Sequence, residues 1–212
     1  MQVHSFEINE ENFRSLQHGA EFNPKNISDH VTVYPVGLGK KNGRFGMRGN
    51  NYEGFLKEGG DAPIMGVTYD CFAHHMKGIL DISNVAFIKL VVEGFEIAVL
   101  EGFTNSLYKY SKIGGMLMEV GPERWERASI ALSTGVAEMK TLATHFKSSF
   151  VVLRTAGHAK TCPTSLADGV LADKNPRKIE TVEMYIVAPN KWGSLLEKMN
   201  VNKFDCNFFY KN

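Results

Sequence analysis

Residues 87–102 constrain the fold of this chain more than any other segment. Their sequence is FIKLVVEGFEIAVLEG. The first half is a nearly unbroken apolar run rich in β-branched residues, which is typical of a strand buried on both faces. The pattern then changes to helical spacing, and a helix dipole favours Glu93 and Glu96 in a first turn. Gly102 is placed to end the helix in a left-handed conformation. The segment therefore predicts a strand, a tight Glu-Gly turn and a short helix.

This segment resembles the FkbM-type methyltransferase family, which carries Lys-(Ile/Leu)-Asp-Val-Glu-Gly-x-Glu-x-x-Val-Leu-x-Gly at the end of its fourth strand. The matching positions are Lys89, Leu90, Val92, Glu93, Gly94, Glu96, Val99, Leu100 and Gly102. The family's Asp is Val91 here. The alternative explanation is an ordinary buried strand and helix, because short motifs recur by chance.

The N-terminal residues 3–21 carry a second part of the resemblance. A short strand ends in Glu7, and Asn9 is placed to cap a helix that runs to about Glu21. The family has (Val/Ala)-x-x-Phe-Glu-Pro-Asn-Pro-x-x-Phe at its second strand and following helix, with both prolines replaced here. The resemblance implies that Glu7 accepts hydrogen bonds from the two ribose hydroxyls of S-adenosylmethionine. The alternative role of Glu7 is an acid at a helix start.

Residues 31–39 are predicted to form a third strand that runs into a turn containing glycine. The resemblance implies that this turn approaches the adenine ring of the cofactor. Gly37 would then permit close approach of the backbone, and Leu38 would supply an apolar contact. The alternative is an ordinary turn at the end of a strand.

Candidate catalytic groups follow from the carboxyl ends of two predicted strands. Residues 113–120 form a further apolar run with Glu119 near its end, and Pro122 then opens a helix. The resemblance implies that Glu93 or Glu119 acts as general base or orients the methyl acceptor, with Lys89 nearby. Alternatively, Lys89 and Glu93 are helix-start charges that pair across the turn.

The remaining chain completes a predicted α/β domain. Residues 150–153 and 181–188 are predicted strands, the second with an antiparallel neighbour, and 155–178 is a predicted loop. An amphipathic helix from Trp192 closes the chain. The resemblance implies one domain over residues 1–212 with a Rossmann-like three-layer α/β/α sandwich. Its sheet would be mostly parallel with an antiparallel last strand.

The family's first strand and its Gly-x-Gly-x-Gly loop have no counterpart before Val3. In the usual strand order that strand separates residues 1–7 from residues 87–92 within one sheet. A gap there leaves backbone groups unpaired, which is costly. Three explanations remain open: the chain is a piece of a longer protein, the two strands close up directly, or a strand of another chain fills the space.

Composition excludes several classes of function. The chain has 212 residues, 24 Lys plus Arg and 23 Asp plus Glu, which gives no electrostatic argument for nucleic acid. No apolar run reaches transmembrane length. Cys71, Cys162 and Cys206 have no metal-binding spacing, so we expect free thiols in a reducing intracellular compartment and no metal site.

The sequence thus supports two hypotheses from different classes. The first is S-adenosylmethionine-dependent methyl transfer to an oxygen or nitrogen of a small molecule or glycan. The second is a catalytically inactive relative that serves as a structural subunit, with protein partners that cover the gap in the sheet. Val91 and the absent glycine loop favour the second, because valine cannot replace a carboxylate in hydrogen bonding.

Overall fold

The computed structural model describes residues 1–48, 55–57, 64–76, 85–103, 113–154, 177–179 and 182–211. The chain is a mixed α/β protein with several sheets, which confirms the α/β class. It divides into two compact units. One contains Met1–Met76 and Val99–Phe103, and the other contains Lys77–Ala98 and Thr104–Asn212. Each unit is described by itself.

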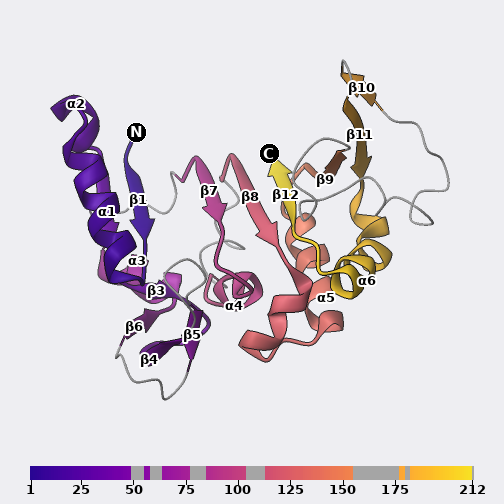
Figure 1. Cartoon of the computed structure of the whole chain (residues 1–212), viewed down its shortest axis with the longest axis horizontal. Coiled ribbons are helices and arrows are strands. Elements are labelled where there is room, and N and C mark those ends of the chain that lie inside the picture. Colours follow the sequence, from indigo (N-terminus) through magenta and orange to yellow (C-terminus); the bar gives the residue numbers. More distant parts are fainter. Residues whose placement is uncertain are drawn as a thin grey trace. The chain divides into compact units, whose positions relative to one another are not determined.

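The first unit contains two small sheets (Figure 1). Strands β1 (Val3–Phe6) and β2 (Val31–Tyr34) form a parallel pair, with Val3 opposite Val31. The other sheet has the order β3-β6-β4-β5. Its strands are β3 (Gly37–Leu38), β4 (Gly43–Arg48), β5 (Phe55–Lys57) and β6 (Ile64–Val67). Strand β4 pairs antiparallel with both β5 and β6.

Among its described residues the first unit has three helices, and α1 begins after Asn9 as the sequence predicts. They are α1 (Glu10–Glu21), α2 (Lys25–Ser28) and α3 (Tyr69–His75). The Asn9 side chain accepts hydrogen bonds from the backbone N–H groups of Glu11 and Asn12, at 2.9 and 3.0 Å. Thr68 accepts the N–H of Cys71 at 3.1 Å. Both caps satisfy amides that a helix leaves unpaired.

The second unit is built on a six-stranded sheet with the order β10-β11-β9-β12-β8-β7. The strands are β7 (Phe87–Leu90), β8 (Gly115–Val120), β9 (Ser148–Arg154), β10 (Arg177–Ile179), β11 (Val182–Val187) and β12 (Cys206–Lys211). The prediction of a mostly parallel sheet is wrong here, because only β7 and β8 pair in parallel. The reason is β12, an unforeseen strand that lies between β8 and β9 and is antiparallel to both. The antiparallel pairing predicted for residues 181–188 is confirmed, since β11 is antiparallel to β9.

The core of this unit lies on one face of the sheet. Its helices are η2 (Pro122–Ala128), α5 (Leu132–Ala143), η4 (Pro189–Lys191) and α6 (Trp192–Asn202). Trp192 is fully buried and packs edge-on against Phe208 and Tyr210 of β12, with ring centroids 4.9 and 5.8 Å apart. Such pairs add about 1 kcal/mol each beyond the area they bury. On the opposite face, Phe150 and Phe209 stack at 5.4 Å and stay half-buried.

The predicted strand, turn and helix at 87–102 is confirmed: β7 leads through a turn into α4 (Glu96–Glu101). The proposed left-handed ending at Gly102 is wrong, because Gly94 is the glycine with positive φ in the part that the structure describes. Gly102 serves close packing instead. A Cβ on it would lie 2.2 Å from the carbonyl oxygen of Gly39.

The expectation that residues 1–7 and 87–92 share a sheet is contradicted. Among the described residues, β1 pairs only with β2, and β7 pairs only with β8.

The cysteines differ from expectation. Cys71 is a free thiol, as predicted, but Cys206 is disulfide-bonded, so the prediction of free thiols is wrong there and gives no argument for a reducing compartment. Cys162 and most of the predicted loop at 155–178 lie outside the described residues. In the described ranges, no helix has the length and apolarity to cross a membrane, and no group of three or more His, Cys, Asp or Glu is arranged to hold a metal ion.

Candidate functional site

The turn between β7 and α4 has an unusual backbone conformation. Glu93 has φ 53° and Gly94 has φ 99°, both in the left-handed region. This region is uncommon for residues other than glycine. A Cβ on Gly94 would lie 2.5 Å from Cβ and 2.6 Å from the carbonyl oxygen of Arg124. Glycine is therefore required both by the backbone and by the close approach of η2.

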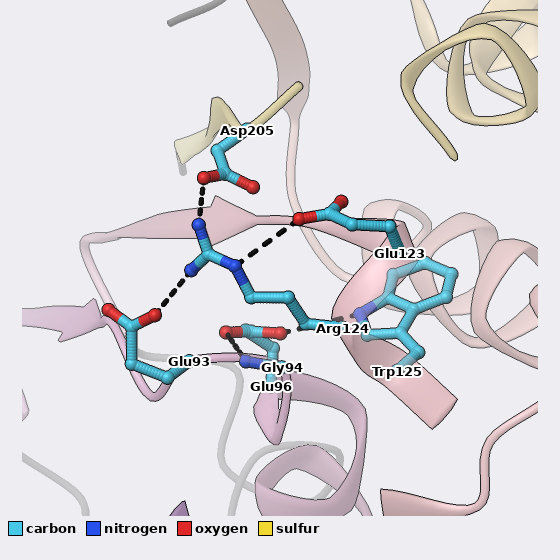
Figure 2. A network of polar contacts seen from close by, with 7 residues as sticks. All are labelled: Glu93, Gly94, Glu96, Glu123, Arg124, Trp125 and Asp205. Atoms are coloured by element: carbon cyan, nitrogen blue, oxygen red, sulfur yellow. Dashed lines mark hydrogen bonds and ion pairs between the residues drawn. The ribbon is translucent and has the colours of Figure 1, made fainter. Parts of the chain in front are cut away.

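Arg124 connects this turn to two other elements (Figure 2). Its Nη1 lies 2.5 Å from Oε2 of Glu93, its Nε lies 3.2 Å from Oε1 of Glu123, and its Nη2 binds Oδ2 of Asp205. Glu93 follows β7, Arg124 follows β8, and Asp205 directly precedes β12. One guanidinium thus ties together three chain segments at the same edge of the sheet.

Negative charge exceeds positive charge in this network. Burial lowers the pKa of Arg124, but attraction to Asp205, Glu93 and Glu123 outweighs burial and raises it, so Arg124 stays cationic. Burial raises the pKa of Asp205 to about 7, against the attraction of Arg124 and with a further contribution from Glu123 and Glu119. Several carboxyls compete for one cation, so they cannot all ionise at low cost.

Two carboxyl oxygens of the network have no donor. Oε2 of Glu123 and Oδ1 of Asp205 are buried, and among the described residues neither has a hydrogen-bond partner. The two side chains lie over Gly121, where a Cβ would be 2.2 Å from Oδ1 of Asp205 and 3.2 Å from Oε1 of Glu123. Buried acceptors without donors are costly.

Glu96 is a buried carboxyl directly below this turn. It is 2% exposed, and its Oε1 accepts the N–H of Gly94 at 3.0 Å while its Oε2 accepts Nε1–H of Trp125 at 3.3 Å. Burial raises its pKa to about 7, although these hydrogen bonds and the charge of Arg124 oppose the shift. Figure 2 shows Glu96 between Gly94 and Trp125, where it holds the turn against η2.

The predicted catalytic residues lie on the strands that form this edge. Glu93 is in the network, paired with Arg124. Glu119 is half-buried on β8, and its charge raises the pKa of both Arg124 and Asp205. Lys89 is exposed on β7 opposite Leu117, which puts it on the same face of the sheet as Glu119. The structure thus brings Glu93 and Glu119 near one arginine.

The predicted cofactor residues lie in the first unit. The Glu7 N–H donates to the carbonyl of Tyr34 at 3.0 Å, and Oε1 of Glu7 accepts the N–H of Asn9 at 2.7 Å. One carboxylate oxygen of Glu7 therefore accepts a backbone hydrogen bond just before α1, and the other accepts no hydrogen bond from a described residue. This arrangement fits a ribose contact in part. Gly37 is buried and Leu38 half-buried in β3, which pairs in parallel with β6.

Sequence reasoning missed Arg124, Glu123 and Asp205 as members of one network. A weak signal was present at Arg124, because a cation in the first turn of a helix opposes the helix dipole and needs a separate explanation. Nothing in the pattern around Asp205 indicated its role, since the strand that it precedes was not predicted.

Comparison with known proteins gives little beyond this geometry. No protein-family model matches the chain, and no curated protein sequence matches it. Among solved structures, the chain is similar to the methyltransferase FkbM from Methylobacillus flagellatus KT, with 19% identity and a TM-score of 0.39. The match covers 56% of this chain and 25% of that chain, so the chain spans a quarter of the length of the matched protein. This is a weak likeness to a methyltransferase, and no function is argued from it.

Proposed function

We propose that this chain is a methyltransferase-like domain of FkbM type that uses S-adenosylmethionine to methylate an oxygen or nitrogen of a small molecule or glycan. One observation carries the proposal. The segment with the family motif folds into a strand, a left-handed Glu-Gly turn and a helix, with Glu93 at the carboxyl end of β7. Ligands of α/β sheets bind at such carboxyl ends.

The proposal includes a single Rossmann-like domain of three layers. The parallel pair β1–β2 with α1, and the parallel pair β7–β8 followed by η2 and α5, support this arrangement. So does β12, which supplies an antiparallel last strand. In this proposal, a protein partner or further chain segment pairs with the open edges of β1 and β7.

The proposed roles follow from what the side chains contact. The cofactor supplies the methyl group on a sulfonium, and the protein aligns the acceptor and removes its proton. Glu119 is the better candidate base, because Glu93 is already bound by Arg124. Lys89 would orient the acceptor. Glu7 would hold the ribose through its second oxygen, with Gly37 and Leu38 against the adenine.

Calorimetric titration with S-adenosylmethionine tests the proposal directly. We expect binding heat and a thermal shift, both reduced by Glu7→Gln and unchanged by Glu10→Gln, which alters an exposed glutamate paired with Arg14. If the wild-type chain gives neither heat nor thermal shift at millimolar cofactor, the enzyme proposal is wrong for this chain.

A second function is favoured by two specific observations. Val91, at the position of the family's Asp, is 37% exposed, and Glu93 serves an ion pair. A structural subunit without catalysis would show both features. The variant Val91→Asp separates the two cases. If the wild type does not bind the cofactor and this variant does, the lost carboxylate explains the inactivity and the structural role is supported.

A further inference from the structure

The half-buried carboxyls of Glu123 and Asp205 pose a problem that the proposed function does not explain. They lie side by side over Gly121, and each has one oxygen on Arg124 and one oxygen without a donor among the described residues. If both are ionised, two carboxylates face each other over Gly121, where Oδ1 of Asp205 lies on the side of Oε1 of Glu123. Like charges in a partly buried site repel more strongly than in water, because the local dielectric is lower.

A single proton resolves this problem. A protonated carboxyl has an O–H donor, and its other oxygen still accepts. If Asp205 carries the proton, Oδ1 donates to Glu123 while Oδ2 continues to accept from Arg124. We propose that Glu123 and Asp205 share one proton, and that loss of this proton separates η2 from the start of β12.

The surrounding charges make the proton-sharing pair sensitive to pH. Arg124 is the cation that faces both carboxyls, and Glu93 from the β7–α4 turn and Glu119 from β8 add negative charge. Glu96 also faces the charge of Arg124. Consistent with the geometry, burial raises the pKa of Asp205 to about 7, and a hydrogen bond that its protonated carboxyl donates to Glu123 is among the further causes. Deprotonation therefore occurs near neutral pH, where it adds a further anion to an acidic network.

The consequence is a conformational switch at the edge of the sheet. Below the transition, η2 and the residues before β12 are joined by the shared proton and by Arg124. Above it, repulsion between Glu123 and Asp205 has to be relieved by separation and by entry of water. The switch does not depend on methyl transfer, so failure of one proposal leaves the other intact.

Carboxyl carbon NMR of the wild-type chain tests the shared proton without any substitution. We expect the Asp205 signal to move in one transition near neutral pH. The Glu123 signal should respond in the same transition, because Glu123 accepts the hydrogen bond that is lost with the proton. If Asp205 instead titrates near its ordinary pKa of 3.8, with no response of the Glu123 signal near neutral pH, the proposal is overturned.

Hydrogen exchange by mass spectrometry tests the opening. After correction for the intrinsic rate, exchange in residues 119–125 and 203–208 should rise by up to about tenfold per pH unit as the pH increases toward the transition, because opening then releases one proton, and it should level off above the transition. The variants Asp205→Asn and Glu123→Gln supply a permanent N–H donor in place of the proton, so each should abolish this rise. The control Glu10→Gln should behave as wild type. A rise that persists in both amide variants, or wild-type exchange that does not change with pH, would overturn the switch.

Discussion

Replacement of Glu96 by glutamine tests the electrostatic reasoning about the β7–α4 turn most directly. Glu96 is 2% exposed, and burial raises its pKa from 4.5 to about 7. A carboxyl with a raised pKa in the folded state stabilises the fold below its unfolded pKa. That stability is lost as the pH rises through the folded pKa. A shift of this size corresponds to about 3 kcal/mol of unfolding free energy, of which about 2.5 kcal/mol falls between pH 5 and pH 8.

Glutamine cannot ionise, so Glu96→Gln should remove this dependence. At low pH the variant should be less stable than wild type by about 1 kcal/mol. The glutamine side chain has an NH₂ group in place of one acceptor oxygen, so it loses the hydrogen bond to the N–H of either Gly94 or Trp125. At high pH the order should reverse, because the wild type then carries a buried charge. The difference in stability between the two proteins should therefore change sign between about pH 5 and about pH 8.

Urea unfolding at a series of pH values, followed by tryptophan fluorescence, measures this difference. Comparing the two proteins at each pH cancels the contributions of other titrating groups to stability. These include Asp205, whose raised pKa also makes stability fall as the pH rises. Glu126→Gln, an exposed position in η2, provides the control and should leave the pH dependence unchanged. If the difference between wild type and Glu96→Gln is the same at all pH values, or changes in the opposite direction, burial does not control the ionisation of Glu96.

Three further predictions concern the same elements. Gly94→Ala should lower stability by more than about 2 kcal/mol, seen as a lower Tm, because its Cβ meets the Arg124 backbone at positive φ. Arg124→Met should cost about 3 kcal/mol in urea unfolding, since it leaves several half-buried acids without a cation. A stability equal to wild type would show that the ion pairs contribute nothing. Asn9→Ala should cost about 1 kcal/mol through loss of the α1 cap, and Asn9→Asp should restore most of it in the same thermal scan.

Local signals in the sequence predicted local structure well. Asn9 caps α1 because its side chain bonds amides two and three residues ahead, which needs no tertiary context. The strand and helix of residues 87–102 were likewise readable, because a change of period is visible in sequence. Gly102 was misread, since glycine permits both a left-handed backbone and close packing, and only the position of Gly39 decides between them.

Features that depend on distant partners were not predictable. Arg124 meets Glu93 and Asp205, which are 31 and 81 residues away in the chain. No periodicity links such positions. Strand β12 was missed for a similar reason, because its identity as a strand depends on β8 and β9 on either side. The candidate catalytic positions followed from a motif, whereas the network that holds them followed only from the fold.

The position of β12 has a consequence for biosynthesis. Residues 206–211 are translated after every other strand of the six-stranded sheet, yet they lie between β8 and β9. The β7–β8 pair and the β9–β11 pair can form on the ribosome, but they remain two separate ribbons with exposed hydrogen-bonding edges. They can be joined only once Lys211 has left the exit tunnel. Completion of this sheet therefore comes late in the folding of these residues, and until then the two ribbons keep exposed edges that favour aggregation.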